Sequence, residues 1–199
     1  MAHFRPIIVV CICLLTFMSG AKAEDAEGTV SKYHLQLQAA IADPNNVSDQ
    51  SLYNALAPVM DIAFDFETMM KTIMGRRWAE ANADTQSRLL AAFRRVSIAT
   101  YADQFAGLKQ GNFEIIGPRD GPRGLKLVES RLNTANERVS LVYVLRIKDD
   151  AWRIIDVLLD GGISELAVRA SEYSSILKNS GPEGLVTSLN EQSKGLLAN

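Results

Sequence analysis

The chain has 199 residues, and its 21 basic and 23 acidic side chains give a formal net charge of −2 at pH 7. This balance argues against a nucleic-acid-binding protein, because such proteins concentrate lysine and arginine on one surface. Hydrophobic residues form 47% of the chain, and a chain of this length can bury one substantial core. We therefore expect one domain in a mildly acidic protein.

The first 23 residues predict a secretory signal peptide. Arg5 precedes a charge-free apolar run, Ile7–Met18, and the small residues Ala21 and Ala23 form an A-x-A cleavage site. A membrane anchor is the alternative interpretation, but the apolar run is too short to cross a bilayer. Cleavage after Ala23 leaves residues 24–199, which we expect to be an exported single domain.

The part of the chain after the signal segment lacks the side chains that most catalytic sites need. Both cysteines, Cys11 and Cys13, lie in the signal segment, and His34 is the one histidine after it. This composition excludes Cys–His catalysis and metal sites built from His or Cys clusters. The sequence has no G-x-S-x-G motif and no glycine-rich phosphate loop. We therefore predict no catalytic residue, no metal ligand and no cofactor.

Residues 28–110 show the apolar spacing of helices. Ser48 and Asp84 are the expected N-caps of the second and fourth helices, and Gly75 is expected to end the third. The four expected helices cover Val30–Ile41, a segment that begins after Ser48, Phe64–Met74 and Thr85–Lys109.

The hydrophobic period changes from 3.6 to 2 between residues 112 and 160. The turns between the expected strands are short, and the longest is the GPRDGPRG segment at 117–124, so the sheet is predicted to be antiparallel. Residues 163–197 return to helical spacing, with Ser164 as a cap and a break at Asn179–Pro182. Helices, strands and helices in this order predict an α+β fold. The four expected strands are Phe113–Ile116, Leu125–Leu132, Val139–Ile147 and Trp152–Leu159.

One apolar stripe in the third helix has two open interpretations. Phe66, Met69, Met70, Ile73 and Met74 recur at the spacing of a single helix face. Methionine is flexible, so it fits an irregular core and also adapts to a variable hydrocarbon ligand. The stripe therefore predicts either ordinary core or the lining of an apolar cavity.

Two carboxylates in apolar surroundings are the remaining candidates for chemistry. Asp65 lies between Phe64 and Phe66, and Asp156 lies within the last strand. Buried carboxylates can act as acids or bases. We interpret Asp65 as an N-cap and Asp156 as a hydrogen-bond acceptor for a neighbouring helix end or arginine. We therefore predict that the protein is not an enzyme, and an enzyme that uses either carboxylate is the weakest hypothesis.

An ordered set of residues resembles the MlaC, or toluene-tolerance, family. Members of this family are periplasmic substrate-binding components of lipid-trafficking ABC systems in Gram-negative bacteria. The segment GGISELAVRASEY departs from the common family pattern and resembles the branch found beside hopanoid biosynthesis. The resemblance runs from about Val30 to Leu189 and rests on FDF at 64–66, Gly75, Trp78, Gln86, Phe93, Tyr101, WRIIDV at 152–157 and Asp160-Gly161.

The resemblance implies a curved four-stranded antiparallel sheet packed with flanking helices around an apolar cavity. It implies a periplasmic carrier of phospholipid or hopanoid-like lipid, with an inner-membrane transporter complex and an outer-membrane lipoprotein complex as partners. We expect a monomer that binds lipid with apolar chains and no nucleic acid. A periplasmic protein-binding or chaperone-like adaptor without lipid is the alternative. The expected lipid-binding residues are Phe66, Met69, Met70, Ile73, Tyr101, Phe105, Leu108, Val142, Val144, Ile155, Val157 and Leu166.

Overall fold

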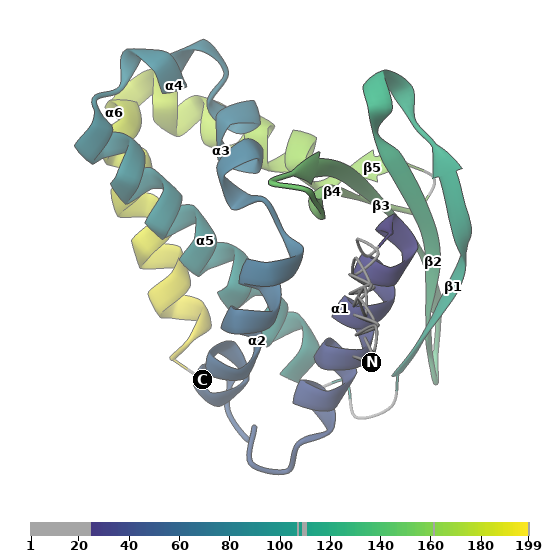
Figure 1. Cartoon of the computed structure of the whole chain (residues 1–199). Helices are drawn as coiled ribbons and strands as arrows, with labels where there is room; N and C mark the ends of the chain where they lie inside the picture. The colour runs from purple at the N-terminus through teal and green to yellow at the C-terminus, as the bar shows by residue number, and fades with distance from the viewer. Residues whose placement is uncertain (1–24, 107, 109–110, 161, 199) are drawn as a thin grey trace, which may run out of the picture.

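Six α-helices and five β-strands occupy the residues that the computed structural model describes, which are 25–106, 108, 111–160 and 162–198 (Figure 1). The predicted signal peptide lies outside these residues. The helices are α1 (Ala26–Ala42), α2 (Asp49–Ala63), α3 (Phe66–Met74), α4 (Arg76–Glu80), α5 (Ala83–Ala106) and α6 (Glu165–Leu196). The strands are β1 (Gly111–Asp120), β2 (Lys126–Thr134), β3 (Arg138–Lys148), β4 (Ala151–Leu159) and β5 (Ile163–Ser164).

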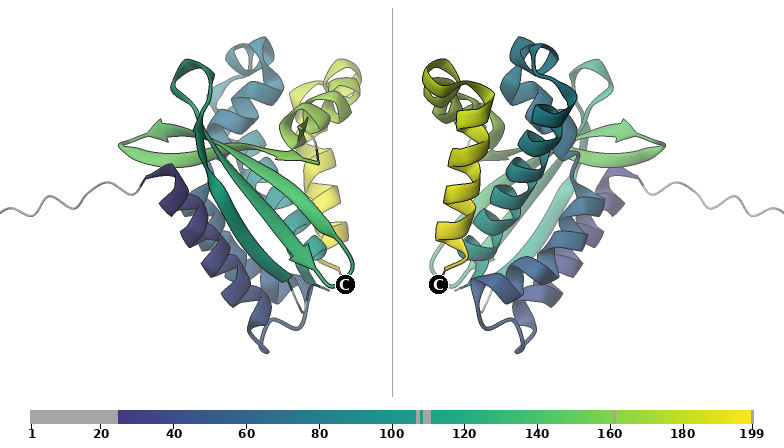
Figure 2. Two further views of the ribbon diagram at one scale, coloured as in Figure 1. Left: turned by 90° about the vertical axis from the view of Figure 1, so that its right-hand side faces the viewer. Right: turned by 90° about the vertical axis from the view of Figure 1, so that its left-hand side faces the viewer.

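The strands form one antiparallel sheet in the order β1-β2-β3-β4-β5. The sheet is curved, and the helices lie on one side of it: one view of Figure 2 has the strands in front, and the opposite view has α5 and α6 in front. This arrangement confirms the predicted α+β class. None of the described helices combines the length and the apolar character that crossing a bilayer requires.

The expected number of four strands is wrong, because a fifth strand follows β4. The chain reverses after Leu159, and Gly162 with φ 106° donates its backbone N–H to the Leu159 carbonyl at 3.0 Å. Ile163 then pairs with Leu159, and Ser164 with Leu158. Two residues are too few to show a period of 2, so the sequence pattern contains no signal for β5.

Several helix starts follow the side-chain caps that the sequence indicates. The Ser48 hydroxyl accepts a hydrogen bond from the Ser51 backbone N–H at 3.2 Å, and the Ser164 hydroxyl accepts one from Ala167 at 2.9 Å. The prediction of Asp84 as a cap is wrong. The Asn82 side chain caps α5 instead, by accepting from the Thr85 N–H at 2.8 Å. Asparagine is as good an N-cap as aspartate, so the two positions compete in the sequence.

Strand β1 is longer than the predicted Phe113–Ile116 and includes part of the expected turn. Gly117 and Pro118 pair with β2, and Ile116 is the extra residue of a bulge between Ile115 and Gly117. β1 is an edge strand, where proline is tolerated because one row of backbone groups faces away from the sheet. The reversal occurs later, at a 3₁₀ turn of Pro122–Gly124.

The expected break in the last helical region lies at Gly181, which has φ 64° and ψ −170° inside α6. Pro182 follows it and lacks a backbone N–H for a helical hydrogen bond. The non-helical backbone of Gly181 divides α6 into two helical segments that meet at a kink, as the predicted break at Asn179–Pro182 indicated. Helix α6 packs chiefly against α5.

The stripe on α3 is buried in the main hydrophobic core. Phe66, Met69, Met70, Ile73 and Met74 are all at most 8% exposed and belong to one cluster with residues of α1, α2, α5 and α6. Burial of each such side chain contributes roughly 1.5–3 kcal/mol to stability. The stripe therefore contributes to the hydrophobic core of the protein.

Candidate functional site

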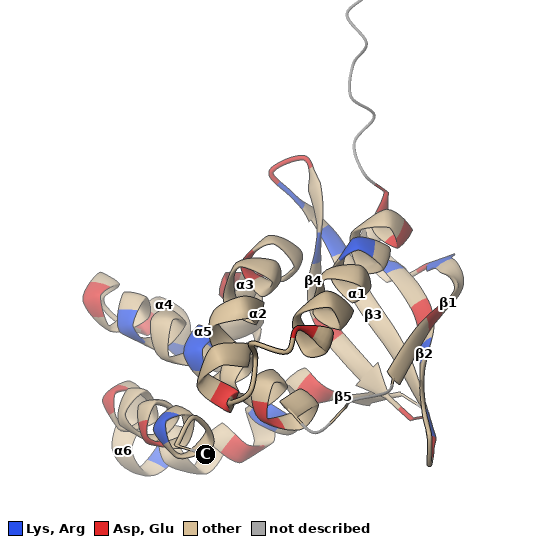
Figure 3. Cartoon of the chain, turned by 90° about the horizontal axis from the view of Figure 1, so that it is seen from below, with Lys and Arg blue, Asp and Glu red and all other residues tan. Residues whose placement is uncertain are grey.

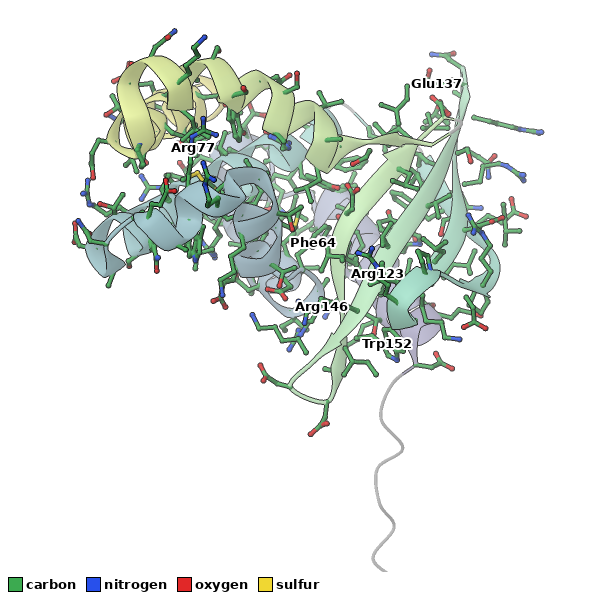
Figure 4. The ribbon with its side chains drawn as sticks, turned by 90° about the horizontal axis from the view of Figure 1, so that it is seen from above. Phe64, Arg77, Arg123, Glu137, Arg146 and Trp152 are labelled. Carbon is green, nitrogen blue, oxygen red and sulfur yellow. The ribbon has the colours of Figure 1, made fainter. Side chains whose placement is uncertain are left out.

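The described residues line a partly open cavity of about 300 Å³ between the C-terminal half of α5 and the sheet. Its volume lies at the lower end of the range for small-molecule pockets. Glu137 lies at its rim, in the turn between β2 and β3, and Figure 4 shows that turn at one end of the sheet. Aromatic and aliphatic side chains dominate its lining, which consists of Tyr101, Gln104, Phe105, Leu108, Phe113, Leu132, Thr134, Glu137, Val139, Leu141, Tyr143, Val157, Leu159 and Glu165.

Strand register brings the sheet side of this lining together. Val139, Leu141 and Tyr143 alternate along β3, so their side chains point to one face. Across the neighbouring strand, Tyr143 pairs with Val157 and Leu141 pairs with Leu159. A continuous apolar surface of two adjacent strands thus faces the helices.

The helix side of the lining comes from α5 and the residues that follow it. Tyr101, Phe105 and Leu108 recur at i, i+4 and i+7 and line the cavity together. The Tyr101 and Phe105 rings have centroids 5.8 Å apart, and Phe105 and Phe113 have centroids 6.2 Å apart. These aromatic contacts connect the helix to β1 at the edge of the sheet.

A second, more polar pocket of about 290 Å³ adjoins the cavity. Leu159 and Glu165 line both spaces, so the two are neighbours with a shared wall. The remaining lining of the second pocket comes from α5, β5 and α6 and includes Thr100, Ile163, Val168, Arg169, Glu172 and Gln192. An apolar space beside a charged one suits an amphiphilic molecule.

Comparison with known proteins identifies the family. The sequence model of the MlaC family, described as MlaC protein, matches residues 32–191. The chain belongs to the MlaC family. This match confirms the resemblance that the sequence pattern indicated.

A solved structure shares the fold of this MlaC-family chain. It is a phospholipid-binding protein from Ralstonia solanacearum in complex with a phospholipid, with a TM-score of 0.77 and 24% sequence identity. The match covers 86% of this chain and 98% of that chain. No curated protein sequence matches this chain.

The structure brings only part of the predicted lipid-binding set to the cavity. Tyr101, Phe105, Leu108 and Val157 line it. The other predicted residues do not line it, and they fall into three groups. On α3 and at the start of α6, Phe66, Met69, Met70, Ile73 and Leu166 lie in the main core. On β3, Val142 and Val144 alternate with Tyr143 and so point away from the cavity. Ile155 is the extra residue of a β4 bulge.

Several lining residues of this MlaC-family site were missing from the predicted set. Val139, Leu141 and Tyr143 alternate along the predicted strand Val139–Ile147, and that alternation was the available signal. The sequence does not state which face of β3 meets the helices, and Val142 and Val144 were equally apolar candidates. Phe113 and Leu132 carried no separate signal beyond their strand positions.

The two carboxylates that were candidates for chemistry, Asp65 and Asp156, accept backbone hydrogen bonds at the starts of α3 and α6. Asp65 accepts hydrogen bonds from the Thr68 N–H at 3.0 Å and from the Lys148 ammonium at 2.9 Å. Asp156 accepts from the Leu166 N–H at 3.0 Å and from the Ser164 hydroxyl at 2.6 Å. Both predicted structural roles are therefore confirmed. Within the described parts of the chain, no group of His, Cys, Asp or Glu side chains is arranged to hold a metal ion.

Glu165 occupies the junction between the cavity and the polar pocket. Burial raises the pKa of Glu165, and the Arg169 cation one helical turn away opposes that rise. The Arg169 guanidinium donates through Nη1 to the Tyr173 hydroxyl at 3.4 Å, a long hydrogen bond. Two half-buried groups of opposite charge thus lie where the apolar space ends.

A buried histidine supports the cavity from behind. His34 is 4% exposed, and its Nε2 lies 3.0 Å from the Tyr143 hydroxyl in a hydrogen bond. Its ring stacks on Phe113 with centroids 4.3 Å apart. Burial lowers the pKa of His34 from 6.5 to about 4, so the ring is neutral at pH 7. His34 therefore fixes two lining side chains, one on β1 and one on β3.

Proposed function

We propose that this chain is a periplasmic lipid carrier that holds apolar chains in the cavity and keeps the polar headgroup in the adjoining pocket. The observation that carries the proposal is the apolar cavity between α5 and the sheet, which shares Leu159 and Glu165 with a charged neighbouring pocket. Such a carrier needs shape and an apolar lining rather than a nucleophile. The cargo would be phospholipid or a hopanoid-like lipid.

The energetic need for a carrier follows from the hydrophobic effect. Each methylene exposed to water costs about 0.8 kcal/mol, so two acyl chains of ~16 carbons face a cost on the order of 20 kcal/mol. A protein that encloses the chains removes this cost without a covalent step. Transfer between membranes then becomes feasible through an aqueous compartment.

Three findings support this proposal. The chain belongs to the MlaC family. A protein of the same fold has been solved with a phospholipid bound. The sequence of residues 1–23 predicts export. We further propose that the protein carries lipid between the inner and outer membranes. Its partners would be an inner-membrane transporter complex and an outer-membrane lipoprotein complex. The carrier itself would be a monomer.

Mass spectrometry of lipid extracted from the purified protein tests the proposal, with two variants in β3 as a matched pair. Val139→Trp fills the cavity, whereas Ile147→Trp changes a side chain that is 54% exposed and lines no part of it. We expect Val139→Trp to raise the Kd for lipid roughly tenfold, equivalent to about 1.4 kcal/mol of binding free energy, and so to lower the loaded fraction. Ile147→Trp should load like the wild type.

Thermal unfolding of both variants separates a blocked cavity from a damaged fold. The proposal fails if the wild type holds no lipid after expression in a Gram-negative periplasm and after incubation with vesicles. It also fails if folded Val139→Trp loads as much lipid as Ile147→Trp.

A further inference from the structure

The polar pocket carries charged side chains that make no direct ion pair within the described part of the chain. Arg169 is its single cation, and Glu165 and Glu172 are its two anions. Glu165 and Arg169 are at i and i+4 on α6, a spacing that commonly gives an ion pair. Among the described residues, however, neither forms one, and the guanidinium has only its long contact with the Tyr173 hydroxyl.

The position of this pocket determines which part of a ligand reaches it. Leu159 and Glu165 belong to its wall and to the cavity wall, so a molecule with hydrocarbon in the cavity places its polar end here. Glu172 lies farther along α6 and is exposed. Glu165 therefore stands at the shared wall, half-buried Arg169 lies one helical turn farther along α6, and Glu172 is the exposed carboxylate beyond it.

We propose that this pocket selects a zwitterionic lipid headgroup, with its phosphate on Arg169 and its ammonium on Glu172. This inference rests on the proposed function. The guanidinium can hold a phosphate through two parallel charge-assisted hydrogen bonds. A headgroup with a phosphate and no cation would leave its negative charge beside Glu172, and like charges in contact disfavour binding. A phosphoethanolamine headgroup supplies a phosphate for half-buried Arg169 and an ammonium for exposed Glu172.

The wider surface does not provide this selection. In the view of Figure 3, lysine and arginine positions alternate with aspartate and glutamate positions over helices and strands. The formal charge of the whole chain is only −2. Selection of a headgroup by its charge must therefore come from the charged side chains of the local pocket.

A competition experiment tests the inference. The purified full chain is incubated with vesicles of equal phosphatidylethanolamine and phosphatidylglycerol with matched acyl chains, and bound lipid is measured by mass spectrometry. We expect phosphatidylethanolamine to be enriched roughly fivefold over phosphatidylglycerol, the effect of one partly exposed ion pair. Glu172→Lys should reverse the preference, because the pocket then offers two cations around the phosphate.

Glu27→Lys is the matched control for charge. Glu27 is exposed on α1 and lines neither space, and its replacement changes the net charge of the chain by the same amount. It should leave the enrichment unchanged. If Glu27→Lys shifts the lipid preference as much as Glu172→Lys does, the net charge of the chain rather than the pocket sets the preference, and the inference is wrong.

Arg169→Gln tests the phosphate contact, with Arg95→Gln on exposed α5 surface as its control. We expect Arg169→Gln to weaken phospholipid loading roughly tenfold, as for a lost charge-assisted hydrogen bond. Loading of diacylglycerol, which has no phosphate, should be the same in both variants. Equal phospholipid loading in the two folded variants would overturn the assignment of Arg169.

The outcomes separate this inference from the proposed function. If the wild type loads no lipid of any kind, the carrier function itself fails. If it loads both phospholipids without preference, or prefers phosphatidylglycerol, the chain remains a carrier and the selective headgroup pocket is wrong.

Discussion

At the scale of a residue, His34 makes the folded state sensitive to acid. The unfolded chain takes up a proton on this side chain near pH 6.5, whereas burial lowers its pKa in the folded chain to about 4. Between these values the unfolded state binds more protons, so the free energy of unfolding falls as the pH falls. The stabilisation is complete above pH 6.5 and is lost towards pH 4, by about 3 kcal/mol.

Urea denaturation at pH 7, 6, 5 and 4 measures this dependence, and His34→Gln isolates it. The variant keeps a polar group near Tyr143 but has no proton to gain. It should be less stable than the wild type at pH 7, and the difference should shrink as the pH approaches 4. Glu165, whose pKa burial raises, titrates in both proteins and so cancels in the comparison. Parallel curves for the two proteins would contradict the role of His34.

At the scale of an element, the start of α5 depends on one side chain. Asn82 caps the helix, and the Gln86 side chain reaches back to the Trp78 and Ala81 carbonyls at 2.8 and 3.0 Å. We predict that Asn82→Ala lowers the free energy of unfolding by about 1 kcal/mol, because it removes the acceptor for an otherwise unpaired N–H group. Asn82→Asp keeps that acceptor and should be close to neutral. Chemical denaturation of both variants measures the difference, and equal losses would contradict the cap.

The helices and strands also show which structural features the sequence pattern predicts and which it does not. The strand Trp152–Leu159 was predicted closely, because a run rich in β-branched and aromatic residues between two turns marks a strand. β5 has only Ile163 and Ser164, and such a short pairing depends on the turn before it rather than on a pattern. Asn82 and Asp84 are both good caps, and their residue types alone do not decide between them.

The candidate site was predicted only in part, for a geometric reason. Alternation divides β3 into two faces but does not say which face meets the helices, and Leu141 and Val142 are equally apolar. In the same way, Met70 on α3 and Phe105 on α5 have the spacing of an apolar helix face. One is core and the other is lining, and only the tertiary arrangement distinguishes them.

At the scale of the whole molecule, the helices are tied to the sheet at the start of α3. Asp65 donates its backbone N–H to the Ile154 carbonyl at 2.9 Å, and its side chain accepts from Lys148. Lys148 also contacts Glu67 at 3.0 Å. In Figure 4, Phe64 lies between the helices and the strands at this connection. We propose that residues 24–199 therefore unfold as one domain.

Ligand binding to such a unit should raise its thermal stability. An empty apolar cavity leaves its lining without contacting atoms on one side, and cargo restores those contacts. A ligand at a free concentration 100 times its Kd adds about 2.7 kcal/mol, and a chain of this size gains about 2–4 °C in Tm for each kcal/mol. Removal of lipid should therefore lower Tm by roughly 5–10 °C. Calorimetry on loaded and delipidated protein measures the shift, and Val139→Trp should show none, because its cavity is already filled. Delipidated wild-type protein that melts at the temperature of the loaded form would place any bound lipid outside the cavity.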